Sequence, residues 1–435
     1  MMHTLQQLQN GELAGIKRLD LSCGLREFPA EIFNLADSLE ILNLSGNALS
    51  TLPDDLPRLH KLRVIFCSDN LFTHVPEVLG KCTQLQMIGF KANQIQHLPA
   101  AALPPALRWL ILTDNQLREL PDALGNCTHL EKLMLAGNQL SALPDSLAGL
   151  QQLALLRISA NQFTELPDWL FQLPRLAWLA YAGNPVSRRS HFPSCDTVAW
   201  DDLQLGELLG EGASGKIYQA QWRDNQPVAV KLYKGSVTSD GLPSCELAAC
   251  VTVGAHPQLM PSLGIIADHP EATAGLIMPM IATHYINLAA PPSLESCTRD
   301  VYAPDIQFSL TSALLMASRL ASAVQHLHEC GLTHGDLYAH NVLWDGVDDV
   351  LLGDFGAATL SDDVRAQRLE VLAFAHLFAE LLERTVDTDK CVLAAAWQLQ
   401  QQCAQTDMTQ RPLFAAIAAQ LTELCQLCAS HTGHN

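Results

Sequence analysis

Two short segments decide how the second half of the chain folds: residues 210–215, Gly-Glu-Gly-Ala-Ser-Gly, and residues 334–341, His-Gly-Asp-Leu-Tyr-Ala-His-Asn. Between them the run Val-Ala-Val-Lys ends at Lys231, and Asp-Phe-Gly follows at residues 354–356. Each motif alone is weak, because glycines and acidic side chains are common in loops. Taken together and in this order, they indicate backbone that can approach phosphates and oxygen ligands that suit a magnesium ion.

The glycine-rich segment lies in a strand-rich region. Residues 202–230 read as a strand, a turn and two further strands, with the glycines in the turn. Gly210, Gly215 and Lys216 also fit the start of a P-loop. That alternative fails at Ile217, which offers no hydroxyl to a magnesium ion, and a helix should follow there instead of a strand. A dinucleotide-binding Rossmann loop needs a helix at the same place, so it is rejected as well.

The four motifs in this order resemble the nucleotide site of a protein kinase, and the resemblance covers about residues 200–428. It implies that Lys231 contacts the α- and β-phosphates of ATP and pairs with Glu246, in a helical-looking segment fifteen residues later. Residues 276–280, Leu-Ile-Met-Pro-Met, resemble the strand and hinge beside adenine in protein kinases. The residues that the resemblance assigns to ATP binding are Gly210, Gly212, Gly215, Ile217, Lys231, Glu246, Met278 and Met280.

The catalytic roles follow from the same resemblance. Asp336 would accept the proton of the attacking hydroxyl, and Lys231 would hold the phosphates. Asn341 would bind Mg²⁺ and orient Asp336, and Asp354 would bridge Mg²⁺ to the phosphates. The expected cofactors are therefore ATP and Mg²⁺.

Several positions depart from the kinase pattern. Gly335 replaces an Arg that commonly reads a phosphorylated activation loop, so we expect that switch to be absent. Tyr338 stands where Ser/Thr kinases have a Lys, and His340 stands where many Tyr kinases have an Arg. Only residues 357–369 separate Asp-Phe-Gly from the expected central helix. The activation segment is therefore truncated and lacks Ala-Pro-Glu, the motif whose Glu normally pairs with an Arg at the position of Arg411.

The first half of the chain is a repeat array. The pattern Leu-x-x-Leu-x-Leu-x-x-Asn recurs in steps of 23 residues, once 22, and each unit continues toward a Leu-Pro pair. The units begin at Ile16, Leu39, Leu62, Leu85, Leu107, Leu130, Leu153 and Leu176. This pattern resembles the leucine-rich repeat, in which neighbouring units share one core and the Asn series satisfies turn backbone.

We therefore expect an α/β leucine-rich-repeat solenoid followed by an α+β bilobal protein-kinase-like domain. The expected boundaries are a helical cap over residues 1–15, the solenoid over 16–190, a linker over 191–199 and the kinase-like domain over 200–430.

The residues expected on the concave face of the solenoid form an apolar stripe. Such a stripe favours a protein partner, with Phe66, Trp109 and Trp178 as candidate anchors. The alternative is that the stripe packs against the second domain of this same chain.

Charge and cysteine usage limit the partners and the compartment. Residues 1–195 carry 15 Lys and Arg against 17 Asp and Glu, whereas residues 196–435 carry 11 against 28. Such an acidic half argues against nucleic acid as a partner. The 13 cysteines form no disulfide or zinc framework, and no apolar run is long enough to cross a membrane. We expect a soluble protein of bacterial or cytosolic type, located in the cytoplasm.

The interpretation that combines both halves is a signalling protein kinase with a repeat arm that binds a protein. It would transfer phosphate from ATP to a Ser/Thr-type hydroxyl, with the protein itself among the candidate acceptors. Two alternatives stay open at this point. One is an ATP-binding pseudokinase scaffold, favoured by the missing peptide platform. The other is a small-molecule phosphotransferase of the aminoglycoside or choline kinase type, which shares His-Gly-Asp followed by Asn.

Overall fold

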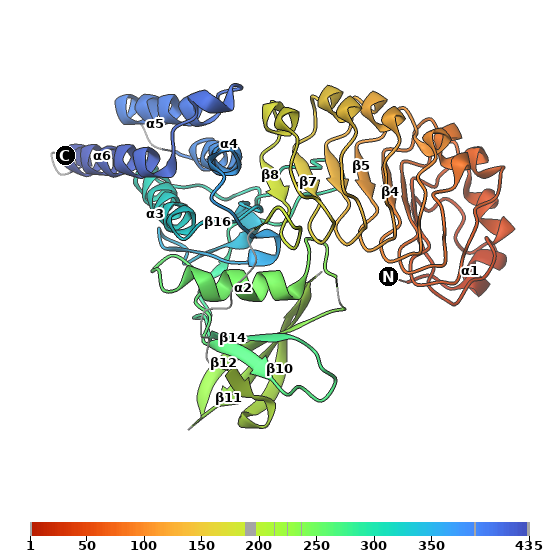
Figure 1. The fold of residues 1–435 in the computed structure, drawn as a ribbon, viewed down its shortest axis with the longest axis horizontal. Coiled ribbons are helices and arrows are strands. Elements are labelled where there is room, and N and C mark those ends of the chain that lie inside the picture. Colours follow the sequence, from red (N-terminus) through yellow and green to blue (C-terminus); the bar gives the residue numbers. More distant parts are fainter. Residues whose placement is uncertain are drawn as a thin grey trace. The chain divides into compact units, whose positions relative to one another are not determined.

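The computed structural model divides into two compact units, shown with the chain coloured by sequence in Figure 1. It describes residues 2–187, 197–212, 214–223, 225–235, 237–386 and 389–432. The first unit comprises Met1–Arg175 with Asn184–Val186, and the second comprises Leu176–Gly183 with Ser187–Asn435. The eighth repeat's strand thus groups with the second unit. The predicted linker over 191–199 lies largely outside the described residues.

The first unit is built of short parallel strands, each followed by a 3-10 helix of three to six residues. The strands pair in chain order and are β1 (Arg18–Asp20), β2 (Ile41–Asn43), β3 (Val64–Phe66), β4 (Met87–Gly89), β5 (Trp109–Ile111), β6 (Lys132–Met134) and β7 (Leu155–Arg157). The 3-10 helices are η1 (Ala30–Leu35), η2 (Leu56–Arg58), η3 (Glu77–Lys81), η4 (Ala100–Ala102), η5 (Asp122–Asn126), η6 (Asp145–Gly149) and η7 (Asp168–Gln172). Six of them begin directly after a proline, which belongs to a Leu-Pro pair in four cases, and the fixed φ of proline suits that extended position.

The repeated asparagines join neighbouring repeats. Asn115 accepts the backbone N–H of Ile95 at 2.9 Å and donates to the carbonyl oxygens of Phe90 at 2.9 Å and Leu112 at 3.1 Å. Asn70 and Asn138 make the same kinds of bonds in their own repeats. These amides satisfy buried turn backbone that no strand partner reaches, so they stabilise the fold and carry no chemistry.

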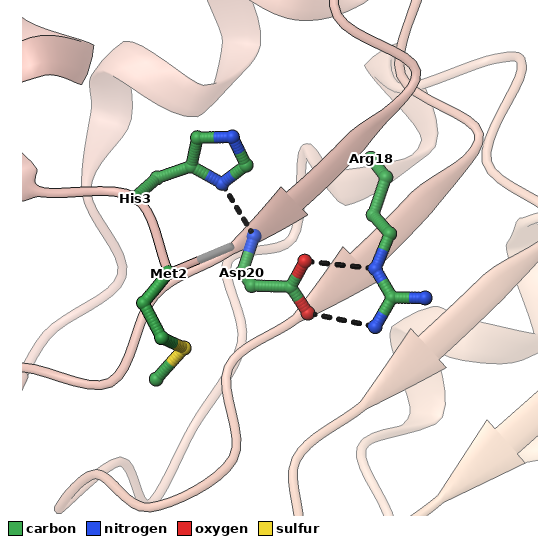
Figure 2. A pocket seen from close by; sticks show the side chains of 4 residues that line it. All are labelled: Met2, His3, Arg18 and Asp20. Carbon is green, nitrogen blue, oxygen red and sulfur yellow. Dashed lines mark hydrogen bonds and ion pairs between the residues drawn. The ribbon is translucent and has the colours of Figure 1, made fainter.

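The N-terminal end of the array is closed by a short helix and an ion pair. Helix α1 (Leu5–Gln9) is capped by the Thr4 hydroxyl, and Leu8 is buried. Met2, His3, Arg18 and Asp20 line a hollow of about 320 Å³. Arg18 donates there to both carboxylate oxygens of Asp20 at 2.8 and 2.9 Å (Figure 2). The bond from Arg18 holds the pKa of Asp20 below its ordinary value, so this carboxylate is already satisfied.

The second unit begins with a mixed sheet and one helix. The strand order is β10-β11-β12-β14-β13-β9, and the sheet packs its apolar face around Val228, Val230 and Ile277. Its elements are β9 (Thr197–Ala199), η8 (Trp200–Asp202), β10 (Leu203–Glu211), β11 (Gly215–Trp222), β12 (Gln226–Tyr233), α2 (Pro243–Val253), β13 (Gly264–Ala267) and β14 (Gly275–Pro279). The predicted succession of three strands from residue 202 to 230 is therefore confirmed.

The rest of the second unit is a helical lobe with short strands. Phe374 stacks on Phe378 at 5.7 Å and meets Phe414 edge-on at 5.4 Å in its core. Its helices are α3 (Leu310–Glu329), α4 (Val364–Leu382), α5 (Lys390–Cys403) and α6 (Phe414–Thr432), with 3-10 turns η9 (Ala339–Asn341), η10 (Phe355–Ala357) and η11 (Met408–Gln410). Its strands are β15 (Ile286–Asn287), β16 (Leu332–Thr333), β17 (Val342–Trp344), β18 (Val350–Leu352) and β19 (Thr359–Leu360), and β8 (Trp178–Ala180) belongs to the same unit. The fold class predicted from the sequence is confirmed in both units.

No helix in the described part of the chain is both long enough and apolar enough to cross a lipid bilayer.

Candidate active site

The glycine-rich loop joins β10 to β11, with Gly210 opposite Ile217 in the register. A Cβ atom built on Gly210 or Gly212 would meet no atom within 4 Å, so protein packing does not require glycine at either position. A Cβ on Gly215 would lie 2.5 Å from the carbonyl oxygen of Leu232. The first two glycines therefore leave open space in which a ligand can approach the backbone, while the third serves the fold.

The predicted lysine is held by two acidic side chains. Lys231 lies on β12 and is 7% exposed, and its Nζ is 2.6 Å from Oε1 of Glu246 and 3.8 Å from Oδ1 of Asp354. Burial by itself would lower the pKa of Lys231, but the carboxylates of Asp354 and Glu246 outweigh it and leave the pKa raised. Lys231 is therefore a fixed cation beside Asp354, as a phosphate contact requires.

Residues expected around adenine lie on the neighbouring strands. Ile217 is opposite Lys231 between β11 and β12, and Met278 is opposite Ala229 between β12 and β14. Met278 is buried, and Met280 follows the end of β14 and is partly exposed. The sheet register thus gathers these side chains near the lysine, although their contact with a nucleotide base stays a prediction.

The predicted catalytic loop, residues 334–341 between β16 and β17, is held by several hydrogen bonds. The amide of Asn341 donates to the backbone oxygen of Asp336 at 2.9 Å and to its Oδ2 at 2.8 Å. The Asp336 N–H donates to Nδ1 of His334 at 3.2 Å, and Nε2 of His334 lies 2.9 Å from the carbonyl oxygen of Gly353. Since Nδ1 accepts, Nε2 carries the ring proton and donates it to Gly353. This network ties the Asp336 loop to the residue preceding Asp354.

The residues predicted to hold metal offer oxygen ligands only. Asp354 has its backbone in the left-handed region, at φ 54°, and its side chain is 49% exposed. Because Asn341 donates its amide nitrogen to Asp336, its amide oxygen is turned elsewhere. No group of three His, Cys, Asp or Glu side chains within the described ranges is arranged to hold a metal by itself. The donor set therefore fits Mg²⁺ that also takes phosphate and water oxygens.

A buried carboxylate that the sequence did not single out supports this loop. Glu370, on α4, accepts the Gly335 N–H at 2.7 Å through Oε1 and contacts Nε2 of His328 at 2.7 Å through Oε2. Burial alone would raise the pKa of Glu370, but the bond from His328 and nearby charges outweigh it, so the pKa lies below its ordinary value. The only available signal was an acidic residue at the start of an otherwise apolar helical run, residues 370–375.

One predicted partner anchor is not available. The ring of Trp178 is 1% exposed and stacks on Tyr338 with 4.2 Å between centroids and 7° between planes. Trp178 is therefore wrong as an anchor for a separate protein, because its ring is covered by residues of its own unit. For this residue the alternative interpretation, packing within the same chain, is the correct one.

The segment after Asp-Phe-Gly is shorter than the sequence suggested. Helix α4 begins at Val364, six residues before Glu370, and β19 fills part of the interval by pairing with β16. Among the residues that the structure describes, Arg411 makes no ion pair; it donates to the backbone oxygens of Gln405 at 2.7 Å and Arg368 at 3.1 Å. Backbone carbonyls thus take over the role of the absent Ala-Pro-Glu acid.

Comparisons with known proteins agree with both halves of this description. Residues 203–391 match the family model "Protein tyrosine and serine/threonine kinase". Residues 105–163 and 128–186, and separately 38–59, match leucine-rich-repeat models.

Among curated proteins, the chain is 29% identical over 213 residues to CBL-interacting protein kinase 22 of Oryza sativa subsp. japonica, covering 43% of this chain and 45% of that protein. It is 30% identical over 188 residues to a probable LRR receptor-like serine/threonine-protein kinase of Arabidopsis thaliana, covering 41% of this chain and 29% of that protein. The chain thus spans less than half the length of these relatives. From the two sets of family models together, this chain combines leucine-rich repeats with a protein kinase domain.

Proposed function

We propose that the chain is an ATP-dependent protein kinase of the Ser/Thr type whose leucine-rich repeats bind a protein partner. The observation that carries this proposal is the simultaneous presence of the buried Lys231–Glu246 pair beside Asp354 and of Asp336 held by Asn341. A scaffold that only binds ATP has no need of an oriented Asp336. This arrangement therefore favours catalysis over the pseudokinase alternative.

In the proposed reaction the side chains of this unit position groups and move one proton. Lys231 holds the phosphates of ATP, and Asp336 accepts the proton of the acceptor hydroxyl as its oxygen bonds to the γ-phosphorus. The bond between the γ-phosphorus and the bridging oxygen breaks, and its electron pair leaves with ADP. Asn341 and Asp354 would hold Mg²⁺, which neutralises charge on the phosphates when bound.

A small hydroxyl compound is the one alternative to a protein as the phosphate acceptor. The interval between η10 and α4 leaves only β19 where protein kinases build a peptide platform, and this shortness favours a small hydroxyl compound. Against it stand the regular glycine-rich loop and Asp-Phe-Gly, which small-molecule phosphotransferases of this resemblance lack. We therefore propose a protein acceptor, and a screen of protein and small-molecule acceptors tests this choice.

The partner of the repeats would contact the surface around Phe66 and Trp109, which are both partly exposed. Lys132, which is itself buried, has its Nζ 4.5 Å from the centre of the Trp109 ring, so a cation packs against this partly exposed aromatic side chain. We also propose a cytoplasmic location, which is supported by the absence of disulfide bonds among the twelve described cysteines.

The test measures Mg²⁺-dependent transfer of ³²P from [γ-³²P]ATP. Three acceptors are compared, namely the chain itself, a basic protein with a peptide array, and a panel of aminoglycosides with choline. We expect label on protein, and Asp336→Asn should lower the rate of labelling by about 10²–10⁴-fold while retaining Mg·ADP binding. Label on the small molecules alone would replace the protein-kinase proposal with the small-molecule one. If no acceptor is labelled but the chain binds nucleotide, and Lys231→Met weakens that binding, the scaffold is favoured.

A further inference from the structure

The eighth repeat contributes more than a last turn of the array. Its strand β8 lies against the catalytic loop, within the second unit. Beside the stack on Tyr338, Nε1 of Trp178 donates to the carbonyl oxygen of Leu337 at 3.0 Å, and the ring lies 5.5 Å from that of His376 on α4. Leu337 and Tyr338 directly follow Asp336. A repeat residue thus holds the backbone between the proposed base and Asn341.

A second contact involves Gly335, on the other side of Asp336. Its φ is +73°, and a Cβ atom there would lie 2.6 Å from the carbonyl oxygen of Ala357 and 2.9 Å from that of Leu179. Both distances are shorter than carbon side chains tolerate, so no residue with a side chain fits. The backbone of β8 therefore closes on the catalytic loop only because position 335 is glycine.

A third contact reaches the shortened segment after Asp-Phe-Gly. The Tyr181 N–H donates to Oγ1 of Thr359 at 3.2 Å, and Thr359 is fully buried and also pairs with Thr333 between β16 and β19. Burial raises the pKa of the Tyr181 phenol to about 12, so it stays neutral here. The segment is thus fixed by β16 and by the end of the eighth repeat, and its Thr359 hydroxyl is out of reach of solvent.

We infer that residues 176–183 are a positioning element of the catalytic loop. This inference rests on the proposed function. If the chain is a protein kinase, the last repeat holds Asp336, Asn341 and the shortened segment after Asp-Phe-Gly in the geometry for phosphoryl transfer. Phosphorylation of the activation segment is then not required. Trp178 is the central positioning residue, because it combines ring stacking with a hydrogen bond to the loop backbone.

Simple packing makes a different prediction from positioning. If Trp178 only stabilised the unit, its loss would weaken nucleotide binding and catalysis together. A positioning residue should instead lower kcat while leaving the KM for ATP and the Kd for Mg·ADP unchanged. The nucleotide residues Lys231 and Glu246 lie on β12 and α2, and neither is among the contacts of β8 described above.

The experiment uses full-length protein and three variants. Trp178→Leu keeps apolar volume but neither stacks nor donates, and Trp178→Phe keeps a ring but does not donate. The matched control is Trp169→Leu, on η7 of the repeat array, whose Nε1 bonds Oδ1 of Asp145 at 3.1 Å. Steady-state kinetics with Mg·ATP are combined with hydrogen exchange of the peptide covering residues 332–342, read by mass spectrometry.

We expect Trp178→Leu to lower kcat by about tenfold or more with KM and Kd within about twofold, since small displacements in a catalytic site cost that much. Exchange at residues 332–342 should rise in parallel, Trp178→Phe should fall between, and Trp169→Leu should match the unsubstituted protein.

Unchanged kcat and exchange in Trp178→Leu would overturn the inference, and so would parallel losses of kcat and Mg·ADP affinity. If Trp178→Leu does not fold, Trp178→Phe carries the same prediction at smaller size. The exchange readout does not depend on activity. If the unsubstituted protein transfers no phosphate while exchange at residues 332–342 still rises in Trp178→Leu, the proposed function fails and the positioning contact stands.

Discussion

Two tryptophans at the same register of two repeats have different surroundings. Trp109 opens β5 and Trp178 opens β8. Trp109 stays partly exposed, with Nε1 3.3 Å from the sulfur of Met134. Trp178 is buried against the catalytic loop and donates its N–H to Leu337. The repeat pattern therefore fixes the backbone position of a concave residue, whereas its neighbours elsewhere in the fold decide whether it is a surface or a structural contact.

The largest expected effect is the loss of the buried ring. Trp178→Ala should lower the free energy of unfolding by about 3–5 kcal/mol, because a large aromatic side chain leaves a cavity that the loop fills poorly. Trp109→Ala should cost about 1 kcal/mol, the typical cost of a point mutation. Urea unfolding of both variants measures the difference. Equal losses would mean that the two sites are not as different as their surroundings indicate.

The second largest loss of stability is expected when a methyl group is added at Gly335, where β8 contacts the predicted catalytic loop. Gly335→Ala should destabilise by about 1–3 kcal/mol, since it combines a strained backbone with a clash against two carbonyl oxygens. Gly212→Ala is the matched control for stability, because its Cβ would meet no atom within 4 Å. Thermal unfolding of the two variants should separate them. A neutral Gly335→Ala would show that β8 can move away from the loop at little cost.

A moderate, pH-dependent effect is expected at Glu370. Its folded-state pKa lies below the ordinary value of 4.5, so it contributes stability above that value and loses the contribution as pH falls through the folded-state pKa. Glu370→Gln should therefore be less stable by about 1–3 kcal/mol at pH 7, and the gap should narrow below about pH 4.5. Denaturant titrations at pH 7, 5.5 and 4 provide the measurement. A gap that widens on acidification would contradict the assignment.

The smallest effect on stability belongs to the proposed partner surface. Phe66→Ala combined with Trp109→Ala should abolish capture of a partner by immobilised protein, with only a small drop in melting temperature. Trp178 is left intact in this variant, because removing it would perturb the second unit instead of the surface. Undiminished capture would move the partner site away from these two rings.

The sequence was most informative where chemistry restricts the residue type. The glycine-rich loop, Lys231, Asp336, Asn341 and Asp354 could be proposed from motif spacing, and the structure brings them together by hydrogen bonds, ion pairs and sheet register. Their roles in catalysis stay predictions. The repeats were equally readable, because a period of 23 residues leaves little choice of fold.

What could not be predicted depends on backbone atoms and on distant partners. Glu370 accepts a hydrogen bond from the N–H of a residue 35 positions earlier, and Trp178 donates one to a carbonyl oxygen 159 positions later. A backbone N–H or carbonyl has no sequence signature, so neither contact could be found by motif. The concave stripe likewise could not reveal which of its members would be covered.

Single-turnover phosphoryl transfer from Mg·[γ-³²P]ATP tests the account most directly, when the unsubstituted protein, Trp178→Leu and Asp336→Asn are compared at saturating nucleotide. We predict that the unsubstituted protein transfers phosphate fastest, that Trp178→Leu is slower by about tenfold and that Asp336→Asn is slower by about 10²–10⁴-fold. All three should have equal affinity for Mg·ADP. Equal rates in the unsubstituted protein and Asp336→Asn would contradict the proposed chemistry. Equal rates in the unsubstituted protein and Trp178→Leu would contradict the role of the eighth repeat.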